Sequence, residues 1–176
     1  MKSIMLSTQP KWVAKILNGE KTVEVRKRFP KDYRGWVYIY CTKAKPFITG
    51  VYNCENKLCF GNIEKNRHNI NGKVVARFYC DNVEYYDDLF WSEEHEKTTC
   101  LKPSEYFDYM FHIRTCRSCY LIHISQLEIF DKPKELSEFK RCTEKTCIYG
   151  KCHKYMHCLK PLTKAPQSWC YVEVER

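Results

Sequence analysis

Four polar residues in the stretch NGEKTVEVRKR, residues 18–28, have types and spacing that suit acid–base chemistry or phosphate binding. Thr22, Glu24 and Arg26 alternate with two valines, so in a β-strand they share one face, and Lys21 stands at the preceding turn. Glu24 can hold either cation in place, and a cation can meet a phosphate. A lysine beside a second cation can also have a lowered pKa, which suits proton transfer. On spacing alone, a solvated strand face with ordinary charge pairs is the simpler interpretation.

A second group of candidate ligands lies near the C-terminus, in the irregular segment 141–166. Its cysteines and histidines follow the pattern C-x4-C-x4-C-H-x3-H-C. Zinc takes four thiolate or imidazole ligands, and a segment with few large apolar residues needs such a staple to become ordered. We therefore expect a structural zinc site, with reduced and unliganded thiols as the alternative. The candidate ligands are Cys142, Cys147, Cys152 and Cys158, with His153 and His157 as alternates.

The composition is that of a globular protein. The chain has 176 residues, 44% of them hydrophobic, which is enough for one domain with a hydrophobic core. The net charge of +9 favours polyanionic partners, and a merely solubilising surface is the equal alternative. No apolar run approaches the ~18 residues that span a bilayer, and the first residues contain no signal-peptide core. We expect a soluble cytoplasmic protein with no membrane partner, whose 12 cysteines are free thiols or metal ligands.

The elements that must position these residues follow no regular βαβ alternation. A helix is predicted to begin at Pro10, capped by Ser7 or Thr8, and to end at Gly19, directly before the charged strand. Further helices are predicted at residues 103–111 and 133–139. Strands are predicted at residues 1–7, 21–28, 36–41, 73–80, 82–86, 118–130 (one long strand or two short ones) and 169–175.

This pattern favours a single α+β domain that spans residues 1–176. We expect a small mixed β-barrel or curled sheet of about six strands, with two or three flanking helices. A cysteine-rich loop excursion is expected as an insertion at about residues 141–166.

The motif Gly19-x-Lys21-x-x-Glu24-x-Arg26 resembles the GxKxxExR signature of the ASCH superfamily, which is related to the PUA domain. The preceding segment IMLSTQPKWVAKILNG is similar to the opening strand and helix of that family. The segments at residues 122–139 and 165–175, IHISQLEIFDKPKELSEF and APQSWCYVEVE, resemble a phage- or prophage-associated bacterial branch. With GKVVARFYC at residues 72–80, the resemblance covers most of the chain outside two cysteine-rich excursions. It implies a PUA-like β-barrel with a cleft beside the motif strand.

The resemblance also implies a choice of functions. ASCH domains are generally proposed to bind RNA or other nucleic acid. One branch hydrolyses the amide of N4-acetylcytidine with a lysine, a threonine and a glutamate; Lys21 matches that lysine, but Glu24 occupies the threonine's position, so the presumed nucleophile is missing. Thr22 is close in sequence but not equivalent. Another branch is reported to cleave RNA, and there Lys21, Glu24 and Arg26 would serve as acid, base and phosphate clamp.

Aromatic and amide side chains complete the predicted nucleic-acid site. Trp36, Tyr38 and Tyr40 share one face of their strand, and Trp169 begins the last strand. Rings beside cations can stack on the bases of a single strand, although each ring can equally belong to the core. Gln167 and Ser168 precede Trp169 and can read a base edge. The predicted binding residues are therefore Lys21, Thr22, Glu24, Arg26, Tyr40, Gln167, Ser168 and Trp169.

The leading hypothesis is a PUA-like ASCH protein that binds RNA or a modified nucleotide in a cleft lined by the GxKxxExR motif. One alternative is an enzyme at the same cleft, a ribonuclease or a hydrolase of a modified nucleoside, with Lys21 and Glu24 as its catalytic residues. Another is a phage-encoded interaction or inhibitor protein that acts on a host nucleic-acid complex and has a protein partner.

Overall fold

The structure is a computed structural model that describes residues 2–48, 51–52, 58–59, 70–87, 90–111, 118–142 and 159–174. The described residues form α-helices, one 3-10 helix and short strands arranged in four sheets. The helices are α1 (Pro10–Leu17), α2 (Glu93–Thr99), α3 (Pro103–Phe111) and η1 (Leu136–Glu138). The strands are β1 (Ser3–Thr8), β2 (Val23–Arg26), β3 (Gly35–Cys41), β4 (Val51–Tyr52), β5 (Leu58–Cys59), β6 (Val74–Cys80), β7 (Val83–Tyr86), β8 (Cys119–His123), β9 (Ser125–Lys134), β10 (Lys140–Cys142), β11 (Leu159–Pro161) and β12 (Trp169–Val172).

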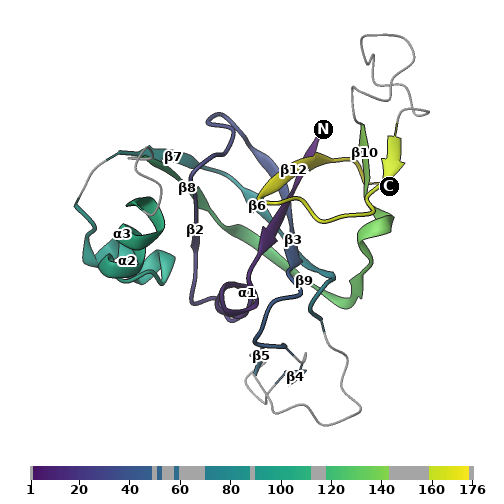
Figure 1. Ribbon diagram of the computed structural model, residues 1–176, viewed down its shortest axis with the longest axis horizontal. Helices are drawn as coiled ribbons and strands as arrows, with labels where there is room; N and C mark the ends of the chain where they lie inside the picture. The colour runs from purple at the N-terminus through teal and green to yellow at the C-terminus, as the bar shows by residue number, and fades with distance from the viewer. Residues whose placement is uncertain are drawn as a thin grey trace.

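The largest sheet has five strands in the order β12-β1-β3-β6-β9 (Figure 1). Its strands are antiparallel to their neighbours except for β1 and β3, which are parallel. Alternate residues of β3 point to opposite faces, as a period of two requires. Val37 and Ile39 belong to the main core together with residues of α1, whereas Tyr38 and Tyr40 belong to a second cluster on the other face. The sheet is therefore covered by apolar side chains on both faces.

A three-stranded sheet with the order β2-β8-β7 adjoins the larger one. The chain passes from the larger sheet to the smaller one between β6 and β7, and back between β8 and β9. Gln126, the second residue of β9, has a φ of 45°. Val23 and Val25 of β2 belong to a third apolar cluster. Its other buried members are Trp91 before α2, Leu101 between α2 and α3, Tyr106 and Met110 of α3, and Cys119 and Leu121 of β8. Figure 1 shows α2 and α3 together on this side of the molecule, away from the large sheet.

Helix α1 connects β1 to β2, the strand that carries Glu24 and Arg26 of the motif. Pro10 opens it, Val13, Ile16 and Leu17 are buried, and Gly19 follows with a φ of +73° that favours glycine. The predicted Ser7 or Thr8 cap is wrong, because Gln9 occupies the N-cap position and its side chain makes no cap hydrogen bond. Ser7 and Thr8 belong to β1 instead. The helix is stabilised by its buried face rather than by a cap.

The α+β fold class predicted from the sequence is confirmed, with three differences in detail. The strand pairings of the described residues give separate sheets and no closed barrel, and they include short strands beyond the predicted six. The helix expected at residues 133–139 is only the 3-10 turn Leu136–Glu138, because β9 continues through Pro133 to Lys134. Helix α2 was not predicted, because its sequence EEHEKTT has no apolar stripe.

The cysteine-rich excursion begins and ends at paired strands. Cys142 of β10 is in register with Leu159 of β11, so segment 143–158 leaves and returns at neighbouring positions. Residues 143–158 lie outside the described residues. Within the described part of the chain, no helix is long and apolar enough to cross a membrane.

Candidate functional site

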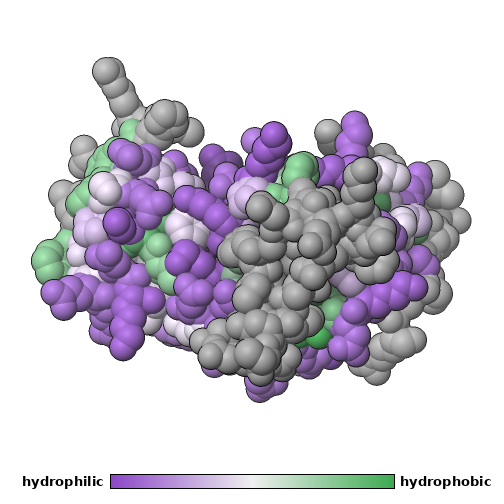
Figure 2. All heavy atoms as spheres, turned by 90° about the horizontal axis from the view of Figure 1, so that it is seen from below, coloured by the Kyte–Doolittle hydropathy of each residue, from purple (hydrophilic) through white to green (hydrophobic). Residues whose placement is uncertain are grey.

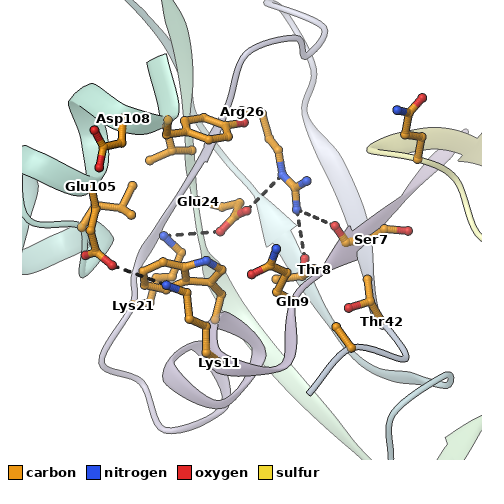
Figure 3. A pocket seen from close by; sticks show the side chains of 16 residues that line it. Ser7, Thr8, Gln9, Lys11, Lys21, Glu24, Arg26, Thr42, Glu105 and Asp108 are labelled. Atoms are coloured by element: carbon orange, nitrogen blue, oxygen red, sulfur yellow. Dashed lines mark hydrogen bonds and ion pairs between the residues drawn. The ribbon is translucent and has the colours of Figure 1, made fainter. Parts of the chain in front are cut away.

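The motif strand forms one wall of a cavity of about 570 Å³ that lies between the end of β1, helix α1, strand β2 and helix α3 (Figure 3). We call this cavity the motif pocket. Its lining is mixed, with charged, amide, hydroxyl and aromatic side chains. The lining residues are Ser7, Thr8, Gln9, Lys11, Trp12, Lys21, Glu24, Val25, Arg26, Thr42, Ala44, Leu101, Glu105, Asp108, Tyr109 and Gln167.

The Glu24 carboxylate joins the two cations of the motif inside this pocket. Its Oε2 lies 3.4 Å from Lys21 Nζ, and its Oε1 lies 3.0 Å from Arg26 Nε. The three side chains are only 7%, 2% and 12% exposed, in the order Glu24, Lys21 and Arg26. The simpler interpretation of the spacing, a solvated strand face, therefore does not hold. A buried charge triad of this kind costs desolvation and is stable only when every charge keeps its partner.

Lys21 is held by a second partner from a distant part of the chain. Its Nζ donates a 2.7 Å hydrogen bond to the carbonyl oxygen of Thr99, the last residue of α2. The last carbonyl oxygens of a helix receive no hydrogen bond from within the helix, and the helix dipole favours a cation near them. Burial nevertheless lowers the pKa of Lys21 below its usual value, against the opposing effect of the Glu24 carboxylate. The ammonium is therefore easier to deprotonate than that of a surface lysine.

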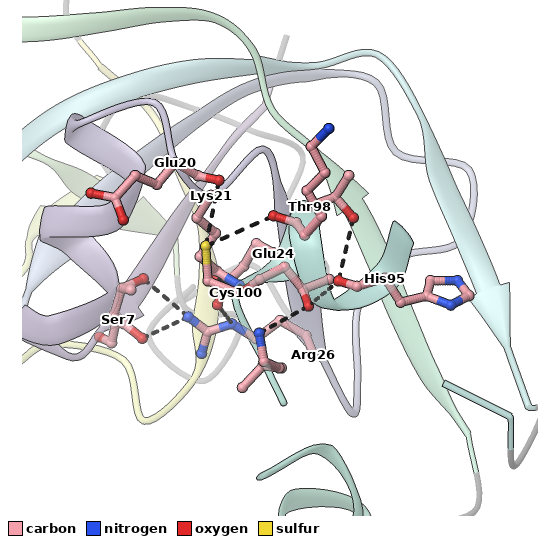
Figure 4. Close-up of polar contacts among 12 residues, drawn as sticks. Ser7, Glu20, Lys21, Glu24, Arg26, His95, Thr98 and Cys100 are labelled. Carbon is pink, nitrogen blue, oxygen red and sulfur yellow. Dashed lines mark hydrogen bonds and ion pairs between the residues drawn. The ribbon is translucent and has the colours of Figure 1, made fainter. Parts of the chain in front are cut away.

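Arg26 ties the motif strand to the end of β1. Its Nη2 donates to the carbonyl oxygen of Ser7 at 2.9 Å (Figures 3 and 4) and to the Thr8 hydroxyl at 3.1 Å (Figure 3). With Nε facing Glu24, most of the guanidinium is already in use within the protein. A phosphate would have to compete with these contacts, so Arg26 positions Glu24 more readily than it clamps a phosphate.

The charges that line the motif pocket balance. Three cationic side chains face three carboxylates, with Lys11, Lys21 and Arg26 on one side and Glu24, Glu105 and Asp108 on the other. A pocket without net charge has no general attraction for an anion. Its carboxylate and amide groups can instead pair with the donors and acceptors of a neutral polar ring, such as a nucleobase.

The mouth of the pocket is aromatic. Trp12 is partly exposed, and Lys11 Nζ lies 4.1 Å from the centroid of its ring. Lys11 also pairs with Glu105 of α3 at 3.4 Å, between side chains that are 49% and 41% exposed. Tyr109 contributes a second ring, with Lys27 Nζ 4.8 Å from its centroid. The Lys11–Glu105 pair joins α1 to α3, and the Lys27–Tyr109 contact joins the residue after β2 to α3.

The structure brings together half of the binding residues predicted from the sequence. Lys21, Glu24, Arg26 and Gln167 all line the motif pocket. Thr22 is exposed and precedes β2. Ser168 does not line the pocket, and its carbonyl oxygen accepts a 2.9 Å hydrogen bond from the Ser7 amide.

Two predicted aromatic residues lie elsewhere. Trp169 packs edge-on against Phe29 and donates from Nε1 to the Arg28 carbonyl oxygen at 2.7 Å. Tyr40 is buried in the second cluster, on the far face of β3. Neither ring lines the motif pocket. The pocket's own aromatic residues, Trp12 and Tyr109, were not among the predicted binding residues. Both lie on helices, and Trp12 shares a helical face with apolar residues, a pattern that indicates core packing.

The predicted metal ligands cannot be assigned a geometry. Cys142 ends β10, whereas Cys147, Cys152, Cys158, His153 and His157 lie outside the described residues. No group of three or more cysteine, histidine or acidic side chains within the described ranges is placed to hold a metal. Among the strand cysteines, Cys41 and Cys80 are buried, and burial raises the pKa of their thiols to about 12 and about 11. They are small core residues.

Comparison with solved structures identifies the fold. The structure is similar to that of an ASCH protein from Zymomonas mobilis, with a TM-score of 0.59 at 18% sequence identity, over 98% of this chain and 88% of that chain. Two single-substitution variants of that protein, tyrosine to phenylalanine and serine to alanine, give TM-scores of 0.59 and 0.58 at 17% and 16% identity, over 98% of this chain and 91% and 89% of theirs. No family model and no curated protein matches the sequence. The chain therefore has an ASCH-type fold.

Proposed function

We propose that the chain binds RNA or a modified nucleotide, with one base held in the motif pocket. The observation that carries this proposal is the convergence of Lys21, Glu24 and Arg26 in a cavity of about 570 Å³ beside exposed aromatic rings. Small-ligand pockets commonly measure about 300–1,000 Å³ and combine apolar walls with a few fixed polar groups. The ASCH-type fold and the GxKxxExR motif support the same class of ligand.

The pocket would bind the base of such a ligand, and the surface around the pocket would bind its phosphates. Glu24 and Gln167 offer acceptors and donors for the edge of a base, and Trp12 offers a stacking surface. Because the pocket is neutral, the net charge of +9 resides mainly outside it, where the phosphates of a strand would run. Charged and polar side chains cover most of the described surface in Figure 2, with small separate hydrophobic patches.

Binding of a short single strand tests the proposal. We expect a fluorescein-labelled oligouridylate of about 3 nucleotides to bind, with log Kd rising against log[salt] by about 0.7 for each phosphate contacted. Fluorescence anisotropy at several salt concentrations measures this slope, and an equal strand of DNA serves as comparison. If no RNA or DNA shows salt-dependent affinity, the proposal is wrong. A stable protein partner in pull-downs would then favour the interaction-protein alternative.

One observation favours an enzyme at the same pocket. Burial lowers the pKa of Lys21, which suits a group that transfers protons, and Glu24 is in contact with it. The corresponding activity would be hydrolysis of RNA or of a modified nucleoside. Incubated RNA separated on a gel, and modified nucleosides analysed by chromatography, report any product. A product that disappears in Lys21→Met while the variant stays folded assigns catalysis to this site, and intact substrates leave binding alone.

We also propose that the cysteine-rich segment holds one structural zinc ion. The pairing of Cys142 with Leu159 supports this, because it brings the two ends of segment 143–158 to neighbouring positions. Purified protein should contain about one zinc per chain, measured by atomic emission, as one four-ligand site requires. The double substitution Cys147→Ser and Cys152→Ser should remove it, whereas Cys41→Ser, at a buried core cysteine, should not. A fully folded, zinc-free preparation would overturn the proposal.

A further inference from the structure

A second cavity, of about 730 Å³, lies on the face of the five-stranded sheet that carries Tyr38. We call it the sheet-face pocket. Its floor is aromatic, with Trp36 and Tyr38 from β3 and Phe130 from β9. Antiparallel sheets that expose a face usually carry polar side chains there. Tyr38 is buried here, whereas Trp36 and Phe130 stay partly exposed, and partly exposed rings at such a place call for a functional explanation.

A guanidinium is stacked on this floor. Arg77 Cζ lies 4.1 Å from the centroid of the Trp36 ring. Both Nε and Nη2 of Arg77 lie 2.7 Å from Glu128 Oε2, which fixes the plane of the guanidinium. Arg77 faces Tyr38 and Glu128 directly in the strand register, so the stack is built into three adjacent strands. A fixed guanidinium beside an indole offers a planar surface for one more ring.

Cations outnumber carboxylates around the sheet-face pocket. Lys2, Arg77 and Lys134 line it, against Glu128 and Glu173. Lys134 Nζ lies 5.4 Å from the Phe130 ring centroid. Stacking rings combined with a small excess of cations suit a nucleotide of a single strand, because each base has a flat face and each phosphate carries a negative charge.

A basic segment leads from the motif pocket toward the sheet-face pocket. The loop between β2 and β3, residues 27–34, carries four cationic side chains and one carboxylate. It starts at the motif pocket, where Lys27 Nζ lies 4.8 Å from the ring of Tyr109. The next carbonyl, that of Arg28, accepts a hydrogen bond from Trp169. The loop is therefore held against the start of β12.

From β12 the connection continues to the sheet-face pocket. The Trp169 and Tyr171 rings are 5.4 Å apart, and Lys2 Nζ lies 5.6 Å from the Tyr171 centroid. Tyr171 is 39% exposed. A shallow hollow here is lined by Lys2, Lys31, Arg34 and Tyr171, and Lys2 also lines the sheet-face pocket. Cations and exposed rings thus connect the two cavities.

We propose that one single-stranded nucleic acid occupies both cavities, with one base in the motif pocket and a later nucleotide stacked at Trp36 and Arg77. The strand crosses the β2–β3 loop between them. This inference rests on the proposed function and adds a second subsite to it. The chemistry requires an unpaired strand, since a base within a duplex has no free face for stacking.

A comparison of strand lengths tests the second subsite. We expect an oligouridylate of about 12 nucleotides, within the range of about 4–16 that compact single-strand binders cover, to bind more tightly than one of about 3. Trp36→Leu and Arg77→Gln should weaken binding of the longer strand by about five-fold to 100-fold and leave the shorter strand unaffected. Fluorescence anisotropy at one fixed salt concentration measures both strands.

A second variant, in which only charges change, tests the subsite even if Trp36→Leu fails to fold. Lys2→Gln with Lys134→Gln removes two cations from the rim of the pocket, and it should weaken only the longer strand and lower its salt slope. Lys97→Gln on α2, an exposed lysine away from the pockets, is the matched control.

The outcomes separate the inference from the proposed function. Equal affinity of both strands, unchanged by these variants, overturns the second subsite and leaves the motif pocket intact. Loss of long-strand binding in Arg77→Gln, but not in the motif-pocket variant Trp12→Leu, supports the subsite and contradicts the proposed function. No binding of either strand overturns both.

Discussion

Replacing Glu24 with alanine is expected to lower the free energy of unfolding by about 3–5 kcal/mol. The substitution leaves Lys21 and Arg26, whose side chains are 2% and 12% exposed, without their common carboxylate. Two like charges would then share a largely buried site, where their repulsion is stronger than in water. Urea denaturation followed by circular dichroism gives the change. The same variant should lose RNA binding, because the cations then repel each other and the pocket loses its central acceptor.

An exposed pair of the same two residue types provides the control. Lys15 and Glu20 approach to 3.2 Å, but their side chains are 39% and 51% exposed. Glu20→Ala should therefore cost less than about 1 kcal/mol, the usual value for an exposed pair. Glu24→Gln keeps the shape of the side chain and should be destabilised less than Glu24→Ala. Equal stability changes in Glu24→Ala and Glu20→Ala would contradict the buried triad.

The sequence was sufficient to predict that Lys21, Glu24 and Arg26 converge. Alternation along a strand and a preceding turn place them together, whatever the rest of the fold does. The burial of these side chains could not be predicted from the local sequence, because residues distant in the chain cover them. The carbonyl oxygen of Thr99, 78 positions from Lys21, accepts the lysine's hydrogen bond. Thr99 ends α2, a helix that the sequence does not predict because it has no apolar stripe. Side-chain spacing can predict contact between residues close in sequence, but the solvent exposure of those residues depends on the tertiary fold.

The aromatic residues illustrate the same limit. The period of two correctly placed Trp36, Tyr38 and Tyr40 on one face of β3. The alternation does not predict which face of the sheet adjoins the motif. These three rings lie on the opposite face, and none of them lines the motif pocket. Trp12, by contrast, lies on a helix next to buried residues, and a pattern of apolar positions cannot separate a ring that lines a pocket from one in the core.

The elements themselves show where local signals suffice. Helix α3 matches its predicted bounds of 103–111, because Pro103 sets its start and two buried residues recur at helical spacing. The 118–130 segment divides into β8 and β9 at Ile124, where the chain moves from one sheet to the other. Such a division depends on which strands pair with each half, and no residue between 118 and 130 is a strong turn signal.

The stacking surface of the motif pocket leads to the second large expected effect. Trp12→Leu should weaken binding of a short oligouridylate by about 5-fold to 150-fold, which corresponds to about 1–3 kcal/mol per stacked base. Leucine keeps apolar contact with the third cluster but has no aromatic face. Lys11 now lies over the Trp12 ring, and a base that stacks there must displace it. That displacement costs little, because the Lys11–Glu105 pair is exposed, and it frees a cation for the phosphate.

Two further variants make this prediction decisive. Trp12→Phe retains an aromatic face and should recover most of the affinity, with Kd within about 5-fold of the original protein, because phenylalanine also stacks on bases. Tyr85→Ala removes a ring that is 48% exposed on β7, away from the motif pocket, and should leave Kd unchanged. Anisotropy titrations compare the four proteins, and circular dichroism verifies that each is folded. If Trp12→Leu binds as tightly as Tyr85→Ala, the base does not stack on Trp12, and the neutral pocket must hold its ligand through Glu24 and Gln167 alone.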